Sequence, residues 1–480
     1  MRHVAIVGGG IAGLAAAYYL QTRGRGAVNY TLVESAPRLG GKIVSARENG
    51  FVVEGGPDSF LTTKPAALEL CRELLLGDDL IGTNDAGRKV YVWSRGQLRA
   101  MPDGVMLIIP TRLTPFVTSS LISPLGKLRM GLEALIPPRR EDEDESLSHF
   151  VTRRLGAEAL DRIAEPMIAG IYVAEAENLS LQSTFPRFLD MEKKYGGLLR
   201  GVVAQKIAAR RNGQVNGNGN GNGNGKPTVS MFMTLRGGLQ QIVESLVERL
   251  PGETLLTNRV VINVRREGRG FVLALSDGAQ LQADEIVFAT PAYVTARLVR
   301  SFEPELAEKL QAVQYVSTAT VSLGYRRAEV THPLNGFGFV VPRSENRKIL
   351  ACTWSSTKFD SRAPEGHVLL RVFIGGARAE QTVEQEDRAL EQIAREELRA
   401  MMGLDATPVV SKVYRWTKAN PQYQVGHQAR IAEIDRLANR QGGLHLAGAA
   451  YHGVGIPDCI EDGKRAVERI LQGYQEDMSA

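Results

Sequence analysis

Three glycines near the start of the chain, Gly8, Gly10 and Gly13, have the spacing GxGxxG, which suits a phosphate-bearing ligand. The first glycine permits a tight turn, the second lets backbone approach a pyrophosphate, and the third lets a helix pack closely on a strand. Glu34 follows about 20 residues later and can accept hydrogen bonds from ribose hydroxyls. Together these residues predict a dinucleotide site rather than a purely structural turn.

A second glycine-rich stretch, GGPDSFLTTKP at residues 55–65, combines turn residues with Asp58 and Lys64. Composition alone indicates a turn. Glycines would also allow backbone to approach a ligand here, and Asp58 is expected to bond nearby backbone rather than act as a base. Lys64 is the one cation of the stretch, and the alternative for it is a surface lysine at the start of a helix.

The elements that must position these residues are readable around the first motif. Residues 3–7 form a short apolar run that predicts a buried parallel strand, residues 11–24 have helical composition, and residues 30–34 predict a second strand. This βαβ unit places the glycines at the N-terminus of a helix, where unpaired N–H groups and a partial positive charge attract phosphate.

Three features favour FAD over NAD. A further glycine turn, PRLGGK at residues 37–42, follows Glu34 directly, and strands ending in FATP at residues 288–291 interrupt the nucleotide domain. The chain then closes with a strand, a glycine-rich turn and a helix over residues 443–471. That helix would bring a second dipole to a flavin ring, where it stabilises the negative charge of the reduced form.

Composition bounds the class of protein. The 480 residues favour two or three domains, and 43% hydrophobic with 23% charged residues describes a soluble globular chain. A net charge of +5 is too small to indicate nucleic-acid binding. The cysteines Cys71, Cys352 and Cys459 lie far apart, so we predict reduced thiols, a reducing compartment and no metal site. We expect neither a signal peptide nor a membrane span.

The rest of the chain is less informative. Residues 212–227 are an Asn-Gly repeat without apolar side chains, which predicts a disordered insertion. Strands are predicted in RVVINV, FVLALS, AQLQ and EIVFAT, with Asp277-Gly278 as a hairpin turn. The amphipathic region 104–136 either touches a membrane or lines an apolar cavity; its apolar residues are Leu107, Ile108, Ile109, Phe116, Leu121 and Ile122.

The blocks VGGGIAGLAAAYYL, LVESAPRLGGKI, EGGPDSFL, TLRGGLQ, RWTKANPQYQVGH and GVGIPDCI resemble the FAD-dependent porphyrinogen oxidases of haem biosynthesis. The similarity runs from the first strand to the last helix and is strongest to the Bacillus-type enzymes. GPDSF and GVGIPDC are far more specific than GxGxxG. The resemblance implies an α/β fold with a Rossmann-like FAD-binding domain of the amine-oxidase type, an α+β substrate domain and a helical domain.

Domain boundaries follow from that resemblance. The predicted FAD-binding domain comprises residues 1–65, 230–295 and 412–480. The predicted substrate-binding domain comprises residues 66–100 and 296–411. Residues 101–211 would form a helical domain that can face a membrane.

The resemblance also implies roles for individual residues. Those carried over to the cofactor are Gly8, Gly9, Gly10, Ile11, Ala12, Gly13, Glu34, Ser35, Lys42, Gly56, Pro57, Asp58, Ser59, Val260, Trp416, Gly455, Ile456 and Pro457. Val260 would pair its backbone with adenine and Trp416 would flank the ring system, although core packing is the alternative for both. Lys64, Gly170 and Phe359 are candidates for contact with the substrate, with Arg88, Lys89 and Arg95 as weaker ones. The alternative for Phe359 is core packing, and the alternative for Gly170 is a helix break.

The activity implied is oxidation of a porphyrinogen to the porphyrin with O₂, and the Bacillus-type similarity favours coproporphyrinogen III over protoporphyrinogen IX. No catalytic residue is assigned, because no partnered histidine pair stands out. The implied setting is cytoplasmic with peripheral membrane contact, and a downstream chelatase of the haem pathway is a candidate partner. The alternatives are an amine oxidase, a carotenoid desaturase, or a flavin-dependent binding or chaperone protein without catalysis.

Overall fold

A computed structural model describes residues 2–479 except 25, 85–87, 104, 107–108, 111–112, 142 and 212–229. The predicted Asn-Gly insertion therefore lies outside the described residues. The chain forms two compact units, each assembled from separate segments. The first contains residues 1–82, 231–315 and 429–480, and the second contains residues 83–230 and 316–428.

The first unit is built on a five-stranded parallel sheet with the strand order β12-β2-β1-β16-β22. Its strands are β1 (Arg2–Val7), β2 (Val28–Val33), β12 (Leu255–Leu256), β16 (Glu285–Phe288) and β22 (Leu444–Leu446). Val4, Ala5 and Ile6 are fully buried, as expected for a parallel strand covered on both faces. The predicted strands at 3–7 and 30–34 are thereby confirmed.

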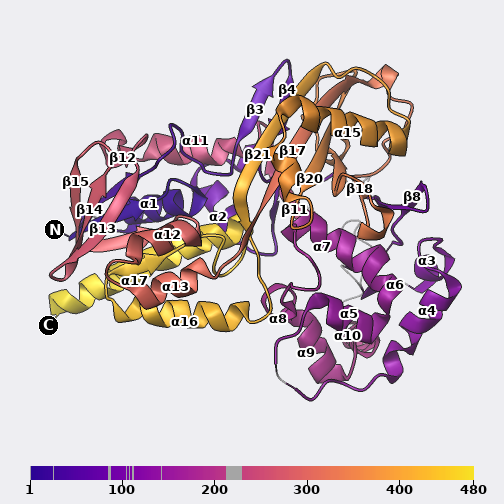
Figure 1. Ribbon diagram of the computed structural model, residues 1–480, viewed down its shortest axis with the longest axis horizontal. Coiled ribbons are helices and arrows are strands. Elements are labelled where there is room, and N and C mark those ends of the chain that lie inside the picture. Colours follow the sequence, from indigo (N-terminus) through magenta and orange to yellow (C-terminus); the bar gives the residue numbers. More distant parts are fainter. Residues whose placement is uncertain are drawn as a thin grey trace. The chain divides into compact units, whose positions relative to one another are not determined.

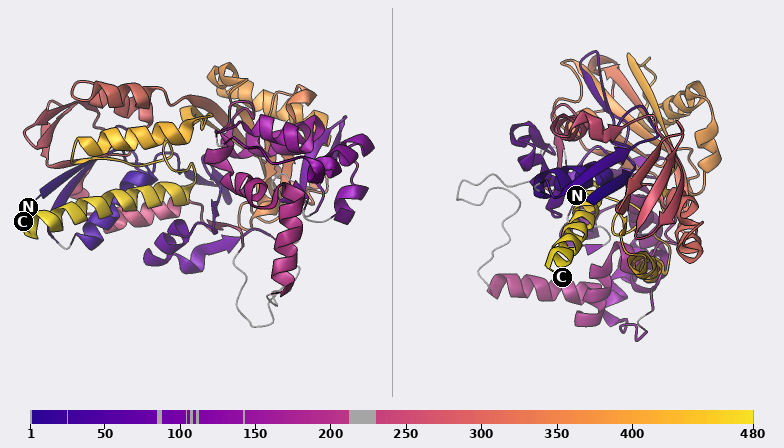
Figure 2. Two further views of the ribbon diagram at one scale, coloured as in Figure 1. Left: turned by 90° about the horizontal axis from the view of Figure 1, so that it is seen from below. Right: turned by 90° about the vertical axis from the view of Figure 1, so that its left-hand side faces the viewer.

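Helices cover this sheet, and two of them come from opposite ends of the chain. Helix α1 (Ile11–Arg23) connects β1 to β2 and completes the predicted βαβ unit. The last helix, α17 (Ile456–Ser479), lies against α1 (Figures 1 and 2). A side chain at Gly463 would come within 2.4 Å of the Ala12 carbonyl oxygen, so glycine permits this close approach. Helices α2 (Ala66–Glu73) and α11 (Gln240–Arg249) pack against α17 and α1 respectively.

Smaller sheets and helices complete the first unit. The predicted hairpin at Asp277-Gly278 is confirmed, and it joins β14 to β15 in an antiparallel sheet with β13. These strands are β13 (Val261–Glu267), β14 (Gly270–Leu275) and β15 (Gln280–Ala283). The other elements are β3 (Ser45–Glu48), β4 (Phe51–Glu54), β5 (Phe60–Leu61), β6 (Leu80–Gly82), β11 (Phe232–Leu235), α12 (Ala292–Val299), α13 (Pro304–Gln311) and α16 (His427–Arg440).

The second unit is organised around a seven-stranded mixed sheet of order β21-β17-β20-β19-β18-β7-β8. Strand β17 is fully or nearly buried along most of its length, and its apolar side chains pack with those of β20 and of α15 (Asp387–Met402). The strands are β7 (Val90–Ser94), β8 (Gln97–Ala100), β17 (Tyr315–Arg326), β18 (Gly338–Val340), β19 (Ala351–Trp354), β20 (His367–Gly375) and β21 (Val410–Pro421).

A helical segment belongs to the same unit. Its described helices are α3 (Leu113–Thr118), α4 (Pro124–Gly131), α5 (Leu147–Leu155), α6 (Ala157–Ala159), α7 (Glu165–Tyr172), α8 (Leu181–Thr184), α9 (Pro186–Tyr195) and α10 (Leu198–Arg211). A π-helical stretch, Leu160–Ala164, joins α6 to α7. Phe116, Leu121 and Ile122 of the predicted amphipathic region are buried, whereas Leu107 and Ile108 lie outside the described residues.

Buried charges hold this helical segment together. The Arg154 guanidinium is fully buried and pairs with the equally buried Glu133 and with Glu192, whose carboxylate oxygen lies 3.4 Å away. Glu133 also accepts hydrogen bonds from the first N–H groups of α10, at Leu198 (2.8 Å) and Leu199 (3.0 Å). The cost of burying each charge is therefore offset by a partner and by a helix terminus.

The three-domain division stays a prediction. The compact units place α2, the end of α12 and α13 with the five-stranded sheet, whereas the predicted boundaries assign residues 66–73 and 296–311 to the substrate-binding domain. The three cysteines are buried and unpaired with one another, as predicted for reduced thiols. Within the described part of the chain, no helix has the length and apolar character needed to cross a bilayer.

Candidate functional site

The GxGxxG turn of the first unit has a different environment at each glycine. Gly8 adopts φ +109°, and an added Cβ would lie 2.8 Å from the Ala289 carbonyl oxygen. At Gly13 an added Cβ would lie 1.9 Å from the Gly8 oxygen. At Gly10 an added Cβ would meet nothing within 4 Å. Gly8 and Gly13 are thus required by the fold, while Gly10 borders open space of the kind that a ligand fills.

Helix α1 begins at this open position. Gly10 is its N-cap residue, in an extended conformation, and no side chain caps the helix. The first N–H groups of a helix lack intrahelical partners, and here they belong to residues that include Ile11 and Ala12. The predicted anion site at the helix N-terminus is therefore sterically available, and its N–H groups and dipole suit a pyrophosphate.

Glu34, predicted to bind ribose, is positioned by backbone N–H groups. One carboxylate oxygen accepts a hydrogen bond from the Gly9 N–H at 2.7 Å. The other accepts from the Ala36 N–H at 2.8 Å and from the Ser35 hydroxyl at 3.1 Å. An ionised carboxylate can accept about four hydrogen bonds, so it keeps capacity for a ribose hydroxyl while its orientation is fixed.

The second glycine turn lies directly beside the first. The Gly40 N–H donates to the Gly9 oxygen at 2.8 Å, and an added Cβ at Gly41 would come within 3.0 Å of the Gly10 Cα. Lys42 follows this turn and is half-buried. Burial lowers the pKa of the Lys42 ammonium, because desolvation disfavours its charged form. The family resemblance pointed to this lysine, and its contact with a cofactor stays a prediction.

The 55–65 stretch is joined to the end of the chain by an ion pair. The Lys64 ammonium nitrogen lies 2.7 and 2.8 Å from the two carboxylate oxygens of Asp458. Asp458 in turn accepts from the Gly455 N–H at 3.2 Å and closes the glycine-rich turn that precedes α17. Lys64 was predicted to face a substrate carboxylate, and in this structure its partner is Asp458.

The residues between the glycines and Lys64 form a half-buried loop. Gly56, Pro57, Asp58 and Ser59 are all partly accessible, and the Ser59 hydroxyl donates to the Asp58 carboxylate at 2.7 Å. This bond involves a side chain, so the predicted bonds from Asp58 to nearby backbone stay a prediction. The predicted contact of these residues with a flavin stays a prediction.

The C-terminal turn presents the N-terminus of a long helix. Ile456 and Pro457 begin α17, directly after Gly455. Just before them, the His452 ring bonds Asp462 at 2.9 Å through Nδ1 and Asp435 at 3.3 Å through Nε2. These two hydrogen bonds raise the pKa of His452 to about 9. A charged histidine therefore ties the turn to α16 and α17, which the sequence did not predict.

Val260 is partly exposed, and both of its backbone polar groups bond Ser276. The Val260 N–H donates to the Ser276 hydroxyl at 3.1 Å, and its carbonyl accepts from the Ser276 N–H at 2.9 Å. Adenine would have to replace the hydroxyl at that N–H or use the second lone pair of the carbonyl. The predicted adenine contact stays a prediction.

The other predicted residues belong to the second unit. Trp416 lies half-buried on β21, and Gly170 is exposed on α7 near Val340 of β18. Phe359 is almost fully buried, with the Arg362 guanidinium 5.6 Å from its ring centroid. This environment matches the packing alternative for Phe359, while the substrate roles of Gly170 and Phe359 stay predictions.

The residues of the first unit fit FAD on structural grounds. A pyrophosphate would meet open space beside Gly10, the uncapped N-terminus of α1 and the half-buried Lys42. A ribose would meet the fixed hydrogen-bond acceptor Glu34. Asp458 and His452 were missed. The only sequence signal for Asp458 was its place at the start of a helix, and its lysine partner is remote in the chain.

Comparisons with known proteins agree with this assignment. Residues 11–471 match the model of the family described as flavin-containing amine oxidoreductases. The chain is 39% identical to a coproporphyrinogen III oxidase of Propionibacterium freudenreichii, over 98% of this chain and 90% of that one. It is 36% identical to the Bacillus subtilis protein of the same name, over 98% of both chains.

A solved structure supports the same relationship. The chain is similar to a crystal structure from Exiguobacterium sp. 255-15 that is provisionally named a protoporphyrinogen oxidase. The TM-score is 0.86, the identity is 31%, and 98% of each chain is covered. The predicted fold class, cofactor and family resemblance are confirmed by these findings.

Proposed function

Because this chain belongs to the flavin-containing amine oxidoreductases, we propose that it is an FAD-dependent oxidase that converts a porphyrinogen to the porphyrin in haem biosynthesis. The observation that carries the proposal is the similarity along 98% of the chain to proteins named coproporphyrinogen III oxidase. The glycine turns supply the cofactor half of the proposal. The relatives favour coproporphyrinogen III as the substrate and leave protoporphyrinogen IX as the second candidate.

The reaction removes six electrons and six hydrogens from the saturated macrocycle. FAD, when bound, accepts two electrons at a time from a carbon centre and passes them to O₂. Three such cycles consume three O₂ and release three H₂O₂ for each porphyrin formed. The proposed acceptor can be checked by measuring that ratio of peroxide to porphyrin, and a different ratio would point to another acceptor.

The protein itself would bind and orient the cofactor and the substrate and shield them from bulk water. The α1 N-terminus and Lys42 would hold the pyrophosphate, and Glu34 would orient a ribose. The α17 N-terminus is proposed to place a partial positive charge at the pyrimidine edge of the ring system. No residue is assigned as a base, because pyrrole protons can leave to solvent or backbone as each bridge enters conjugation.

Anaerobic mixing tests the function directly. The purified FAD-loaded protein is mixed separately with coproporphyrinogen III and protoporphyrinogen IX, and flavin bleaching and porphyrin fluorescence are followed. We expect bleaching with at least coproporphyrinogen III. Failure of both substrates to bleach the flavin would refute the proposal, and bleaching by an amine or a carotenoid instead would favour the other flavoprotein classes.

Membrane contact is a separate part of the proposal. Four leucines are exposed at helical spacing along α4 and the turn after it, and we call them the leucine face: Leu125, Leu128, Leu132 and Leu135. Exposed apolar side chains grouped on one surface are typical of contact sites for lipid or protein. This face, rather than the buried Phe116, Leu121 and Ile122, supports the proposal.

Liposome flotation tests whether the leucine face binds lipid. We expect the wild-type protein to float with phosphatidylcholine vesicles, and Leu125→Ser with Leu135→Ser to remain in the dense fraction. Leu75→Ser is the matched control, because Leu75 is 83% exposed in the other unit. Wild-type protein that does not float would remove membrane contact from the proposal. A downstream chelatase stays a candidate consumer of the product, supported by the family resemblance alone.

A further inference from the structure

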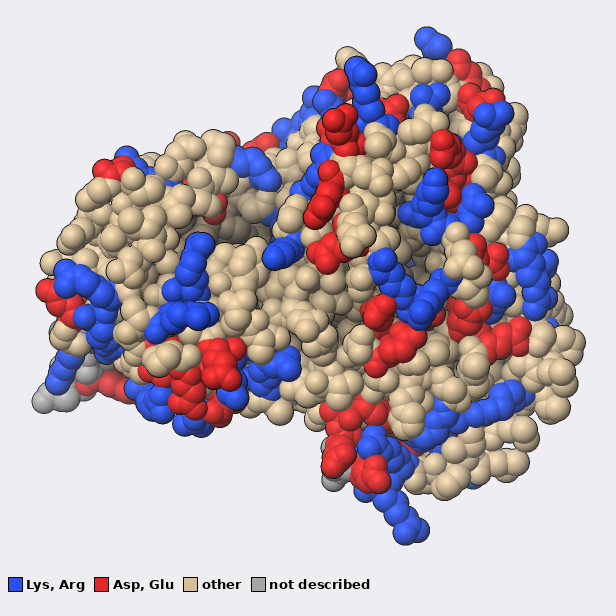
Figure 3. All heavy atoms as spheres, viewed as in Figure 1, with Lys and Arg blue, Asp and Glu red and all other residues tan. Residues whose placement is uncertain are grey.

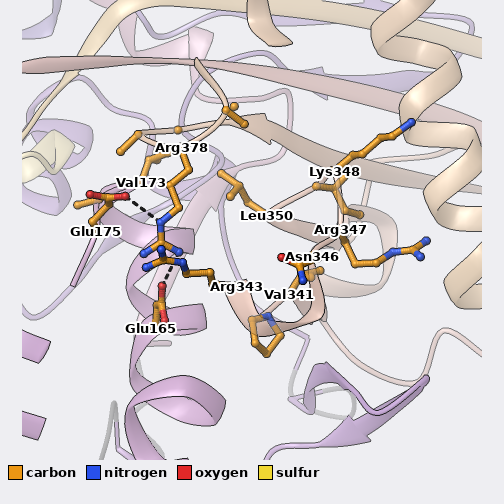
Figure 4. Close-up of a pocket in the computed structure, with 17 residues that line it drawn as sticks. Glu165, Val173, Glu175, Val341, Arg343, Asn346, Arg347, Lys348, Leu350 and Arg378 are labelled. Atoms are coloured by element: carbon orange, nitrogen blue, oxygen red, sulfur yellow. Dashed lines mark hydrogen bonds and ion pairs between the residues drawn. The ribbon is translucent and has the colours of Figure 1, made fainter. Parts of the chain in front are cut away.

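The second unit contains a pocket of about 350 Å³ that none of the predicted site residues lines. It lies where the end of α7, the loop between β18 and β19, and the loop after β20 meet (Figure 4). Small-molecule pockets of proteins have volumes of roughly 300–1,000 Å³. A pocket of this volume suits a small ligand or one edge of a larger planar molecule.

The pocket is lined by apolar residues and by more basic than acidic side chains. Val341, Leu350 and the glycine pair Gly375 and Gly376 contribute apolar or backbone surface. The charged lining residues are four cations and two anions: Arg343, Arg347, Lys348, Arg378, Glu165 and Glu175. An amphipathic ligand that carries negative charge would match this distribution.

One of the arginines is held rigidly. Arg378 contacts Glu165 at 2.9 Å and Glu175 at 2.8 Å, and it also lies 3.4 Å from Glu177. Burial raises the pKa of the Glu165 carboxyl, so the pair with Arg378 is partly desolvated. Arg378 therefore fastens the loop after β20 to α7 and to the chain that follows it.

Arg347 is also held firmly, because its guanidinium lies 2.7 Å from the buried Glu397 carboxylate. Arg343 and Lys348 are held more loosely. The Arg343 side chain is 56% exposed and lies 3.2 Å from Glu177, which is itself half-exposed. Figure 4 shows its guanidinium beside that of Arg378. Lys348 is 63% exposed and lies 3.8 Å from Glu396. Exposed ion pairs of this kind contribute little to stability, so a ligand carboxylate can replace them at little cost.

The pocket wall also contains backbone that is costly to form. Val173, the residue that directly follows α7, adopts φ +54° and ψ +28°, which is rare for a β-branched residue. Its side chain packs so closely on Gly376 that an added Cβ there would lie 2.9 Å away. The π-helical stretch Leu160–Ala164 precedes α7. Such backbone irregularities gather at ligand sites, where the surrounding structure maintains them.

The geometry points to this pocket as a binding site for the carboxylate-bearing edge of an amphipathic ligand, with Arg343 and Lys348 as the exchangeable cations. Two sources share that chemistry. One is the propionate edge of a tetrapyrrole, which rests on the proposed function, and the other is a free small dicarboxylate. The porphyrin of coproporphyrinogen III has four carboxylates, so it would use such a site more fully than the dicarboxylic protoporphyrin IX.

Binding measurements on the full FAD-loaded chain test this inference. The probes are coproporphyrin III, its tetramethyl ester and protoporphyrin IX, followed by fluorescence, and glutarate, followed by calorimetry. The variant is Arg343→Gln with Lys348→Gln, which removes two exposed cations. The control is Arg395→Gln with Arg399→Gln, which removes two charges from α15 at positions that do not line the pocket.

We expect the double variant to weaken binding of coproporphyrin III by roughly tenfold, as for loss of hydrogen bonds to charged groups, while the control and the ester are unaffected. If glutarate alone shows this dependence, the ligand is a small dicarboxylate. If all four probes bind the variant and the control equally, the inference is wrong. Flavin bleaching of the wild type tests the proposed function separately, so either idea can fail without the other.

Discussion

The glycine turns of the first unit and the charged helical segment of the second are rigid for opposite reasons. Around Gly8 and Gly13 the backbone segments approach so closely that no side chain fits. Around Arg154 the helices are held by side chains whose charges are buried together. An added side-chain atom should therefore destabilise the glycine turns, and removal of one charged group should destabilise the helical segment.

The largest expected effect is in the second region. Arg154→Met would leave Glu133 buried without its ion pair, at a cost of about 3–5 kcal/mol in the free energy of unfolding. The measurement is urea unfolding followed by circular dichroism. The double variant with Glu133→Gln is the control, because removing both charges costs less than removing one. If the double variant is the less stable of the two, the explanation by charge pairing is wrong.

A smaller loss of stability is expected from a single methyl group in the first region. Gly13→Ala would place Cβ 1.9 Å from the Gly8 oxygen and should destabilise the unit by about 3 kcal/mol. Gly10→Ala meets no protein atom, so we expect wild-type stability with lost flavin. Thermal unfolding of the purified variants checks their stability, and their flavin absorbance checks whether FAD is bound. Equal flavin content in Gly10→Ala and wild type would contradict the proposed pyrophosphate contact.

The ion pair between Lys64 and Asp458 joins two loops of the first unit and should contribute less. Lys64 is half-exposed, so its pair is worth about 0–1 kcal/mol. We expect Lys64→Ala to retain FAD and to bind the porphyrinogen more weakly. Asp458→Asn breaks the same pair while leaving the lysine free for substrate. If Lys64→Ala releases FAD, the lysine serves the cofactor loop rather than the substrate.

The last effect depends on pH and concerns His452. The bonds from Asp435 and Asp462 raise the folded-state pKa of His452 to about 9, above its ordinary value of 6.5. The charged histidine therefore contributes stability that is fully present below pH 6.5 and is lost as pH rises through 9. Unfolding measured from pH 6 to pH 10 should show this decline in the wild type and a flatter profile in His452→Gln. Parallel profiles would exclude His452 as the cause.

The sequence predicted correctly those parts of the fold that depend on residues close together in the chain. The first βαβ unit, the hairpin at Asp277-Gly278 and the last helix were predicted correctly, because strand periodicity, glycine spacing and turn residues each act over a few positions. The pair between Lys64 and Asp458 spans 394 residues, and no local pattern indicates it. The pocket lining likewise comes from loops that only the folded sheet brings together.

The amphipathic region 104–136 was predicted incompletely, because its sequence does not show which apolar side chains are buried. Phe116 and Leu121 were expected either to touch a membrane or to line an apolar cavity. They are buried, which argues against membrane contact for these two residues, whereas Leu125 and Leu128 of the same region are exposed. Apolar composition indicates that a segment can be buried, but it does not specify which face of the segment packs against the core. Figure 3 shows a similar limit for charge, since basic and acidic side chains are mixed over the face viewed and a net +5 forms no single patch there.

The strand order of the first unit has a consequence for how the protein is made. Strands β1 and β2 emerge first, but β22 and α17, which complete the sheet edge and pack on α1, come from the last 40 or so residues. Synthesis proceeds from the N-terminus, at about 5–20 residues per second. Helix α1, which follows the first glycine motif, therefore gains its packing partner α17 only after the residues between the two helices have been made.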